Sequence, residues 1–185
     1  MKIDLMILAA GNSRRFHGNK LLSPYQGKPL ILHTLDKVKA LPFRKVVVVS
    51  QYPTICSWAQ DHGYFPVINP DPDQGIASSL HHGMDALPDS EAILFLVGDL
   101  PDLKPSTLQQ MLLAAKPDKI IAAYDGEIKN PMLFPKRFFA EIRMLQGDQG
   151  AKKAALRHKD AIIPILVDPK ELLDIDERND LNRDH

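Results

Sequence analysis

The chain has 185 residues, of which 44% are hydrophobic and 25% charged, and its 23 acidic residues balance its 23 lysines and arginines. A chain of this length buries about 70% of the surface that it exposes when unfolded, so it can form one domain with a sizeable core. Proteins whose main ligand is nucleic acid usually carry a basic excess, and a membrane span needs about 20 consecutive apolar residues. The sequence has neither feature, so we expect no nucleic-acid partner and no membrane span, and any anion must be bound locally.

The cysteine content and the N-terminal segment bear on the cellular compartment. Cys56 is the only cysteine, so no disulfide can form within the chain, which suits a reducing compartment. The first apolar run is too short for the core of a signal peptide, and the basic pair Arg14 and Arg15 follows it instead of preceding it. We therefore expect a cytoplasmic protein.

Short apolar runs alternate with amphipathic segments along the chain, and this alternation predicts strands separated by helices. The predicted strands, which read as buried and parallel, are residues 3–9, 46–50, 65–68, 92–97, 120–123 and 162–167. The predicted helices are residues 29–41, 54–62, 76–87, 106–115, 136–145 and 150–158. Residues 132–134 do not fit a crossover unit and are a candidate antiparallel strand. The pattern predicts an α/β fold with helices on both faces of a mostly parallel sheet, in a single domain over residues 1–185.

The candidate site lies where the predicted strands end, because ligands of open α/β sheets bind beyond the carboxyl ends of the strands. Four polar segments follow predicted strands: residues 10–20, 69–79, 98–102 and 174–176.

The first of these segments combines a glycine turn with three cations. Gly11, preceded by two alanines, lets the backbone approach a ligand closely, and consecutive amides in a turn can bind an anion. Arg14, Arg15 and Lys20 add positive charge, and a guanidinium can bind phosphate through two hydrogen bonds. The segment suits a polyphosphate, and a solvated basic turn is the alternative interpretation.

Two common phosphate-binding loops do not match this segment. The dinucleotide fingerprint G-x-G-x-x-G is absent, because Ser13 and Phe16 stand where it needs glycines. The ATPase P-loop has four residues between its glycines, whereas six separate Gly11 from Gly18, and Asn19 intervenes before the lysine.

Residues 8–22, LAAGNSRRFHGNKLL, resemble the signature L-A-A-G-x-[SG]-x-R-x-G-x-x-K-L-L of nucleotidyltransferases, and most of all the branch that contains molybdenum cofactor cytidylyltransferase. The resemblance implies a three-layer α/β/α sandwich of the nucleotide-diphospho-sugar transferase type, with a mostly parallel Rossmann-like sheet. It also implies a loop that wraps the triphosphate of an NTP. The nucleotide-binding residues that it implies here are Leu8, Ala9, Ala10, Gly11, Asn12, Ser13, Arg15 and Lys20. Arg14 falls on a variable position, and the extra residue before Gly18 leaves His17 without a role.

Two acidic positions resemble the metal ligands of the same family. Asp99 follows a predicted strand in the sequence GDLP, similar to the family's G-D-[QM]-P, whose aspartate holds Mg²⁺. Asp176 lies in DID, similar to a family element whose second aspartate helps to hold the metal, with Asp174 as its neighbour. Mg²⁺ usually takes one or two carboxylates together with phosphates and water, so the implied protein ligands are Asp99 and Asp176. The alternatives are that Asp99 caps the helix near Ser106 and that Asp176 belongs to a charged tail.

Residues 69–80 resemble the family segment N-x(n)-G-[MIL]-[AS]-x-S-[LI], which lies near the base and the ribose. The resemblance implies that Gln74, Gly75 and Ser79 face the nucleotide. The alternative is that a serine or asparagine of this segment caps the helix that follows.

Two further segments resemble parts of the family around the acceptor. Residues 130–134 are similar to G-[NH]-P-V-[LV]-F, but Lys129 replaces the glycine. Residues 145–152 are similar to L-x-G-D-x-G-A-[RK], a turn that lines the acceptor pocket. Capping of the following helix by Asp148 is an equal alternative.

The resemblance implies a Mg²⁺-dependent nucleotidyltransferase with Arg15, Lys20 and Asp99 as catalytic residues. The implied reaction transfers CMP from CTP to the phosphate of molybdenum-bound molybdopterin, a pterin-type small molecule, and releases pyrophosphate. A phosphate monoester is largely dianionic at pH 7 and needs no general base. A molybdoenzyme or its chaperone would then receive the product. The alternatives are a guanylyltransferase that uses GTP or another small-acceptor nucleotidyltransferase, an NAD(P)H-dependent oxidoreductase, and a non-catalytic cofactor-binding or insertion chaperone.

Overall fold

The computed structural model describes residues 1–12 and 19–175 of the chain. The strands of its main sheet are β1 (Ile3–Leu8), β4 (Val46–Ser50), β5 (Phe65–Ile68), β6 (Ala92–Val97), β7 (Ile120–Tyr124), β8 (Ile128–Pro135) and β9 (Ile162–Leu166). The α-helices of these residues are α1 (Leu30–Val38), α2 (Pro53–Asp61), α3 (Ile76–Asp85), α4 (Pro105–Leu113), α5 (Phe139–Arg143) and α6 (Ala151–Leu156). No helix in the described ranges is long and apolar enough to cross a membrane.

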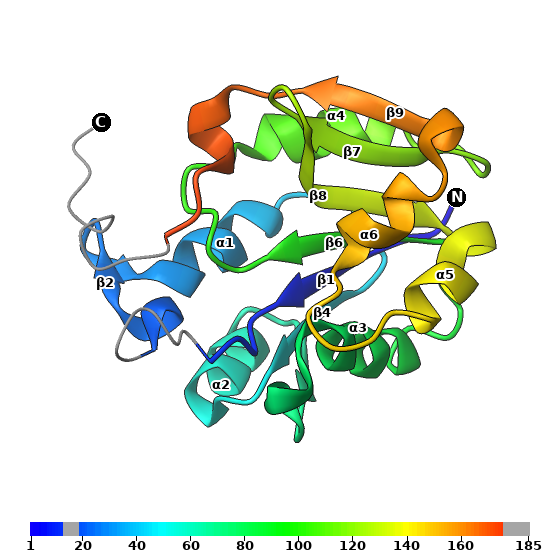
Figure 1. Ribbon diagram of the computed structural model, residues 1–185. Coiled ribbons are helices and arrows are strands. Elements are labelled where there is room, and N and C mark those ends of the chain that lie inside the picture. Colours follow the sequence, from blue (N-terminus) through cyan, green and yellow to red (C-terminus); the bar gives the residue numbers. More distant parts are fainter. Residues whose placement is uncertain (13–18, 176–185) are drawn as a thin grey trace.

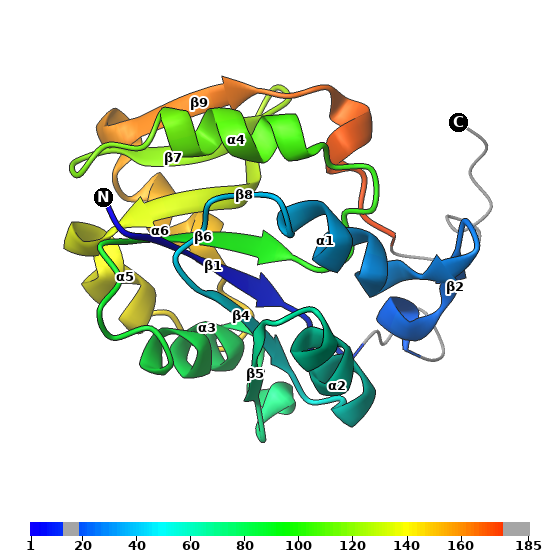
Figure 2. The same ribbon diagram turned by 180° about the vertical axis from the view of Figure 1, so that it is seen from behind.

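The sheet lies between two layers of helices, so the predicted three-layer α/β/α architecture is confirmed (Figure 1). Helices α3, α5 and α6 cover one face, and α1, α2 and α4 cover the other, as the view from behind shows (Figure 2). Successive residues of β1 pack on opposite faces: Leu5 and Ile7 join the core under α1, α2 and α4, and Met6 and Leu8 join the core under α3, α5 and α6. This alternation of side chains along a strand explains why β1 is apolar from Leu5 to Leu8.

The strand order β5-β4-β1-β6-β8-β7-β9 creates a crevice at the carboxyl end of β1. From β1 the chain passes outward to β4 and β5, and it then returns to place β6 on the other side of β1. These four strands are parallel, so their carboxyl ends share one edge of the sheet. Loops leaving β1 and its neighbours diverge at such a reversal of strand order, which is where ligands of open α/β sheets bind.

Strand β8 is antiparallel to both β6 and β7, which confirms the candidate antiparallel strand at residues 132–134. The strand is longer than predicted, because its N-terminal half pairs with β7 although its sequence is polar. The predicted helix over residues 136–145 is wrong in extent. A 3₁₀ turn (Lys136–Phe138) precedes the short α5, and its last residue, the buried Phe138, is the N-cap of α5.

A two-stranded hairpin of β2 (Pro24–Tyr25) and β3 (Lys28–Pro29) precedes α1 and was not predicted. Its turn residues Gln26 and Gly27 have φ angles of +45° and +86°, as a two-residue hairpin turn requires. Strands of two residues are too short to show an alternating pattern, so the sequence did not reveal them.

Candidate functional site

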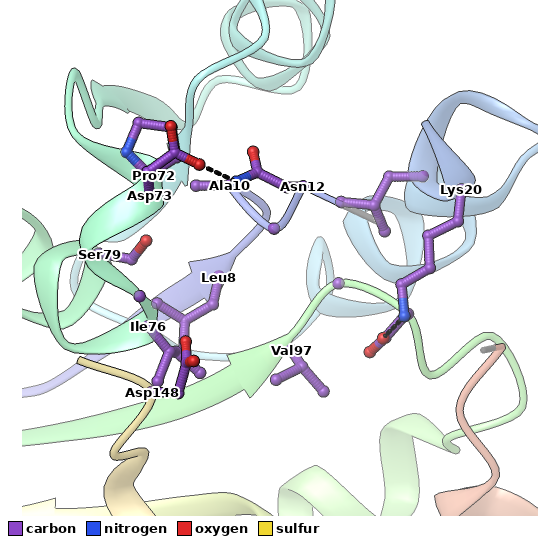
Figure 3. A pocket seen from close by; sticks show the side chains of 15 residues that line it. Leu8, Ala10, Asn12, Lys20, Pro72, Asp73, Ile76, Ser79, Val97 and Asp148 are labelled. Carbon is purple, nitrogen blue, oxygen red and sulfur yellow. Dashed lines mark hydrogen bonds and ion pairs between the residues drawn. The ribbon is translucent and has the colours of Figure 1, made fainter. Parts of the chain in front are cut away.

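A cavity of about 450 Å³ opens at the carboxyl edge of the sheet, beside the ends of β1 and β6 (Figure 3). Lys20 lies on one side of it, and Asp73, Ser79 and Asp148 lie on the other. The predicted site residues that line it are Leu8, Ala10, Gly11, Asn12, Lys20, Gly75, Ser79 and Asp99.

The other predicted residues are placed differently. Ala9 is buried behind the loop, and Gln74 lies exposed on a 3₁₀ turn (Pro72–Gln74) without lining the cavity, as far as the described residues define it. Ser13, Arg15 and Asp176 lie outside the described residues, as do Arg14 and His17, for which the sequence suggested no role.

The end of β4 holds the loop that follows β1. The side chains of Ser50, Gln51 and Tyr52 donate hydrogen bonds of 2.9, 2.8 and 3.1 Å to the carbonyl oxygens of residues 9, 10 and 11. The C=O and the next N–H of a trans peptide point in opposite directions, so the amides of residues 10–12 turn away from β4, toward the cavity. Sequence reasoning missed these three residues. Their signal is a polar run directly after a buried strand that neighbours β1.

A hydrogen-bond chain connects this loop to the one after β5. Gln51 Nε2 donates to Asn12 Oδ1 at 2.6 Å, and Asn12 Nδ2 donates to Asp73 Oδ1 at 2.7 Å. The second of these bonds is drawn in Figure 3. The chain joins two walls of the cavity, and neither Gln51 nor Asp73 was predicted from the sequence.

The buried side chain of Asn69 orients the start of α3. Its Oδ1 accepts from Ser78 Oγ at 3.0 Å, and its Nδ2 donates to Ser79 Oγ at 2.9 Å. Because Ser79 Oγ already accepts this bond, its own proton is available to a ligand in the cavity. The capping interpretation is wrong for α3, because Gly75 occupies the N-cap and no side chain of the described residues caps the helix.

Lys20 and Asp99, far apart in the sequence, form an ion pair in the cavity. Lys20 Nζ lies 2.6 Å from Asp99 Oδ2, and the two side chains are 18% and 16% exposed. Gly98, directly before Asp99, packs closely against α1, since a Cβ at this position would lie 2.6 Å from Ile31 Cδ1. Asp99 does not cap α4, whose N-cap is Lys104. Asp99 Oδ1 is buried and has no hydrogen-bond partner within residues 1–12 and 19–175.

A second cavity, of about 350 Å³, adjoins the first and shares Leu8, Ile76, Val97 and Asp99 with it. Its remaining lining residues are Leu100, Lys129, Asn130, Met132, Gly150, Ala151, Lys152, Leu172 and Asp174. Asp99 therefore stands at the boundary between two spaces, one beside the glycine loop and one beside β8 and α6.

Close packing between two glycines connects the segments around the two cavities. A Cβ on Gly75 would lie 2.3 Å from the carbonyl carbon of Gly147, and Ala77 N donates to Gly147 O at 3.0 Å. Asp148 follows directly and lines the first cavity. It does not cap α6, whose N-cap is Gly150, so the capping interpretation is wrong here too.

Residues 5–162 match the family model of the MobA-like NTP transferase domain. The chain belongs to this family. The bifunctional protein GlmU of Alkalilimnicola ehrlichii is 29% identical over 163 residues, which are 86% of this chain and 33% of GlmU. A probable molybdenum cofactor guanylyltransferase of Pyrococcus horikoshii is 32% identical over 115 residues, which are 60% of this chain and 56% of that protein. The chain thus spans about a third of the length of the GlmU proteins that it matches.

Solved structures share the fold along nearly the whole chain. Rv0371c from Mycobacterium tuberculosis superposes with a TM-score of 0.82 and 25% identity over 97% of this chain and 95% of that one. A nucleotidyl transferase from Methanothermobacter superposes with a TM-score of 0.84 and 20% sequence identity, over 96% of this chain and 93% of that chain. A manganese complex of Rv0371c superposes with a TM-score of 0.74 and 23% sequence identity, over 90% of this chain and 89% of that chain.

The described part of this MobA-like domain holds few groups that could bind a metal. No cluster of three or more His, Cys, Asp or Glu side chains suited to a metal occurs in it. Among the described residues, the charged side chains that line the first cavity are Lys20, Asp73, Asp99 and Asp148.

Proposed function

We propose that the protein is a nucleotidyltransferase that binds an NTP in the first cavity and a small phosphorylated acceptor in the second. The observation that carries this proposal is that the two cavities meet at Asp99. An acceptor phosphate oxygen in the second cavity can then attack the α-phosphorus of the NTP, while the bond from that phosphorus to the bridging oxygen breaks and pyrophosphate leaves. Catalysis would consist of positioning and neutralisation of charge, since an acceptor phosphate needs no general base.

The residues proposed for the nucleotide fall into three groups. The amides of residues 10–12 and of Ser13, with Arg15 and Lys20, would bind the phosphates. Ser79 and Gly75, with Leu8 and Ala9 behind them, would face the nucleoside. Gln74 lies outside the cavity lining and would need to turn inward to reach a base.

A divalent cation fits the described residues at one point. Asp99 Oδ1 is buried and has no hydrogen-bond partner among the residues that the structure describes, and metal ligation is a use for such an oxygen. We propose Asp99 and Asp176 as ligands of Mg²⁺, since the amide of the preceding Ile175 donates to Asp99 O at 3.4 Å. The ion would neutralise charge on the reacting phosphates.

The proposed donor is CTP and the proposed acceptor is molybdenum-bound molybdopterin, as the L-A-A-G branch resemblance favours. The product would then be the cytosine dinucleotide form, passed to a molybdoenzyme or its chaperone. GTP is the second candidate, because the Pyrococcus horikoshii relative carries the name of a guanylyltransferase.

Pyrophosphate release with each of the four NTPs, molybdopterin and Mg²⁺ tests this proposal. We expect release with CTP well above release with GTP, and loss of release when EDTA removes the metal. If GTP were the one NTP that gives pyrophosphate release, the donor would be GTP and not CTP. No release with any NTP, together with NAD(P)H-dependent reduction of a dye, would support the oxidoreductase alternative. Binding of CTP and molybdopterin without release would support the chaperone alternative.

Replacement of Lys20 by methionine tests the ion pair with Asp99. Without the ammonium, Asp99 Oδ2 becomes available to a metal, so we expect tighter Mn²⁺ binding, measured by electron paramagnetic resonance. Turnover should fall about 10- to 100-fold, because a charge-assisted contact to phosphate is lost. Lys28→Met is the matched control, since Lys28 pairs with Asp36 and lines neither cavity. Unchanged Mn²⁺ affinity in Lys20→Met would contradict the proposal that Asp99 is a metal ligand.

A further inference from the structure

Two lysines line the second cavity on elements that are distant in sequence. Lys129 lies on β8 and Lys152 on α6, and both belong to the cavity that shares Asp99 with the first one. Lys129 stands where the similar family element has glycine, so its ammonium is a feature of this chain that the family resemblance does not account for.

An irregularity in the sheet places Lys129 and its neighbour at the cavity. Residues 122 and 123 of β7 are consecutive, but their partners on β8 are Met132 and Lys129, so two extra residues of β8 bulge out of the ladder. Bulges redirect side chains and are frequent beside active sites. Within the bulge, Asn130 Oδ1 accepts a 2.9 Å hydrogen bond from Val97 N at the end of β6. This bond ties the bulge to the strand that leads into Asp99.

The β7–β8 turn supplies a carboxylate to each lysine. Lys129 Nζ lies 2.8 Å from Asp125 Oδ2, and Lys152 Nζ lies 2.7 Å from Glu127 Oε2. The hydrogen bond from Lys129 to Asp125 raises the pKa of Lys129, and the hydrogen bond from Lys152 lowers the pKa of Glu127. Lys129 is therefore charged at neutral pH. The side chains of Lys152 and Glu127 are 42% and 61% exposed, and such surface pairs are weak enough for a dianion to replace the carboxylate.

We infer that Lys129 and Lys152 bind the phosphate group of the acceptor and hold one of its oxygens beside the α-phosphorus of the NTP. The inference rests on the proposed function. Each ammonium can donate a charge-assisted hydrogen bond to a phosphate oxygen, although Asp99 and Asp174 line the same cavity. Met132, Leu100 and Leu172 give this cavity an apolar surface for the body of the acceptor. The acceptor class is thus a phosphate monoester whose body has an apolar part, and both lysines are specificity-determining residues.

Kinetics with separate variation of the two substrates test the inference. In Lys129→Gln and in Lys152→Gln, we expect the KM for molybdopterin to rise about 10-fold or more, because each loses a charge-assisted hydrogen bond to phosphate. The KM for CTP should stay within about twofold of wild type, as both lysines lie outside the first cavity. The matched control is Lys153→Gln, which removes the same charge from an exposed neighbour on α6 that lines neither cavity. An unchanged KM for molybdopterin, or an equal rise in Lys153→Gln, overturns the inference.

Loss of Lys129 also leaves the mostly buried Asp125 without its ion pair. A double variant, Lys129→Gln with Asp125→Asn, is therefore also measured, because it removes both charges of the pair. Thermal unfolding verifies that each variant is folded. Lys152→Gln tests the same inference without leaving a buried charge, because the ion pair of Lys152 with Glu127 is exposed.

A readout without turnover separates this inference from the proposed function. Acetic anhydride labels exposed lysines, and mass spectrometry gives the labelling rate of each. We expect molybdopterin to slow the labelling of Lys129 and Lys152 at least threefold, with no change at Lys153, and CTP alone to leave all three rates unchanged. If the wild type released no pyrophosphate with any NTP, the proposed function would fail, and this protection pattern would still decide the inference. Equal labelling with and without molybdopterin overturns it.

Discussion

Replacement of Asp99 by asparagine is expected to lower kcat by about 10³-fold while the protein stays folded. The substitution keeps the size of the side chain but removes the negative charge at the boundary of the two cavities. The ion pair with Lys20 that the variant loses lies in the first cavity, and neither residue belongs to the hydrophobic core, so we expect the fold to persist. Pyrophosphate release gives kcat, and circular dichroism with thermal unfolding verifies the fold.

Asp102→Asn is the matched control for Asp99→Asn. Asp102 lies on the same loop after β6, lines neither cavity and accepts hydrogen bonds from Tyr25. We expect turnover near that of wild type, because this change leaves the boundary of the cavities intact. The two variants also differ in Mn²⁺ binding, which Asp99→Asn should weaken and Asp102→Asn should not. Retained turnover in Asp99→Asn would remove Asp99 from the catalytic residues.

Replacement of Gly75 by alanine is expected to have the largest effect on stability around the site, about 2–4 kcal/mol. Gly75 has φ +83° and ψ −176°, a region that is nearly restricted to glycine and costs about 1–3 kcal/mol for other residues. The added Cβ would also lie 2.3 Å from Gly147 C and 2.7 Å from Asp148 N, and overpacking of this kind costs about 1–3 kcal/mol. The two loops must separate to accept it, so CTP affinity should fall as well. Urea denaturation and CTP titration measure the two effects.

Gly63→Ala separates backbone strain from the steric clash. Gly63 has a φ of +78°, close to that of Gly75, but a Cβ there would meet nothing within 4 Å. Its expected cost is therefore only that of the positive φ, about 1–2 kcal/mol, without any change in CTP affinity. If the two variants lost equal stability and bound CTP equally well, the contact between Gly75 and Gly147 would not couple the two loops.

Local patterns in the sequence were sufficient to predict the layers of the fold. Runs such as residues 92–97 are apolar on both faces, which indicates a strand buried between helices, and the amphipathic segments between them indicate those helices. The predicted order of elements along the chain is therefore largely confirmed. The short hairpin of β2 and β3 and the polar half of β8 were missed, because neither segment carries a periodic apolar pattern.

The glycine loop after β1 and the carboxylate after β6 could be found from the sequence, since both depend on residue types directly after a strand. The sequence could not show that Ser50, Gln51 and Tyr52 hold the glycine loop through hydrogen bonds. These contacts exist because β4 lies beside β1 in the sheet, and the order of strands is a property of the assembled sheet.

By itself, then, the sequence determined the α/β class, the family resemblance and about half of the residues that line the first cavity, because these follow from periodicity and from short motifs. Only the tertiary structure decided that Lys20 contacts Asp99, that Gly75 packs against Gly147, and that Lys129 and Lys152 share a cavity with Asp99. The physical reason is that each of these contacts joins residues far apart in the chain. Their distances depend on strand order, on a bulge in β8 and on loop packing, and local propensity encodes none of these.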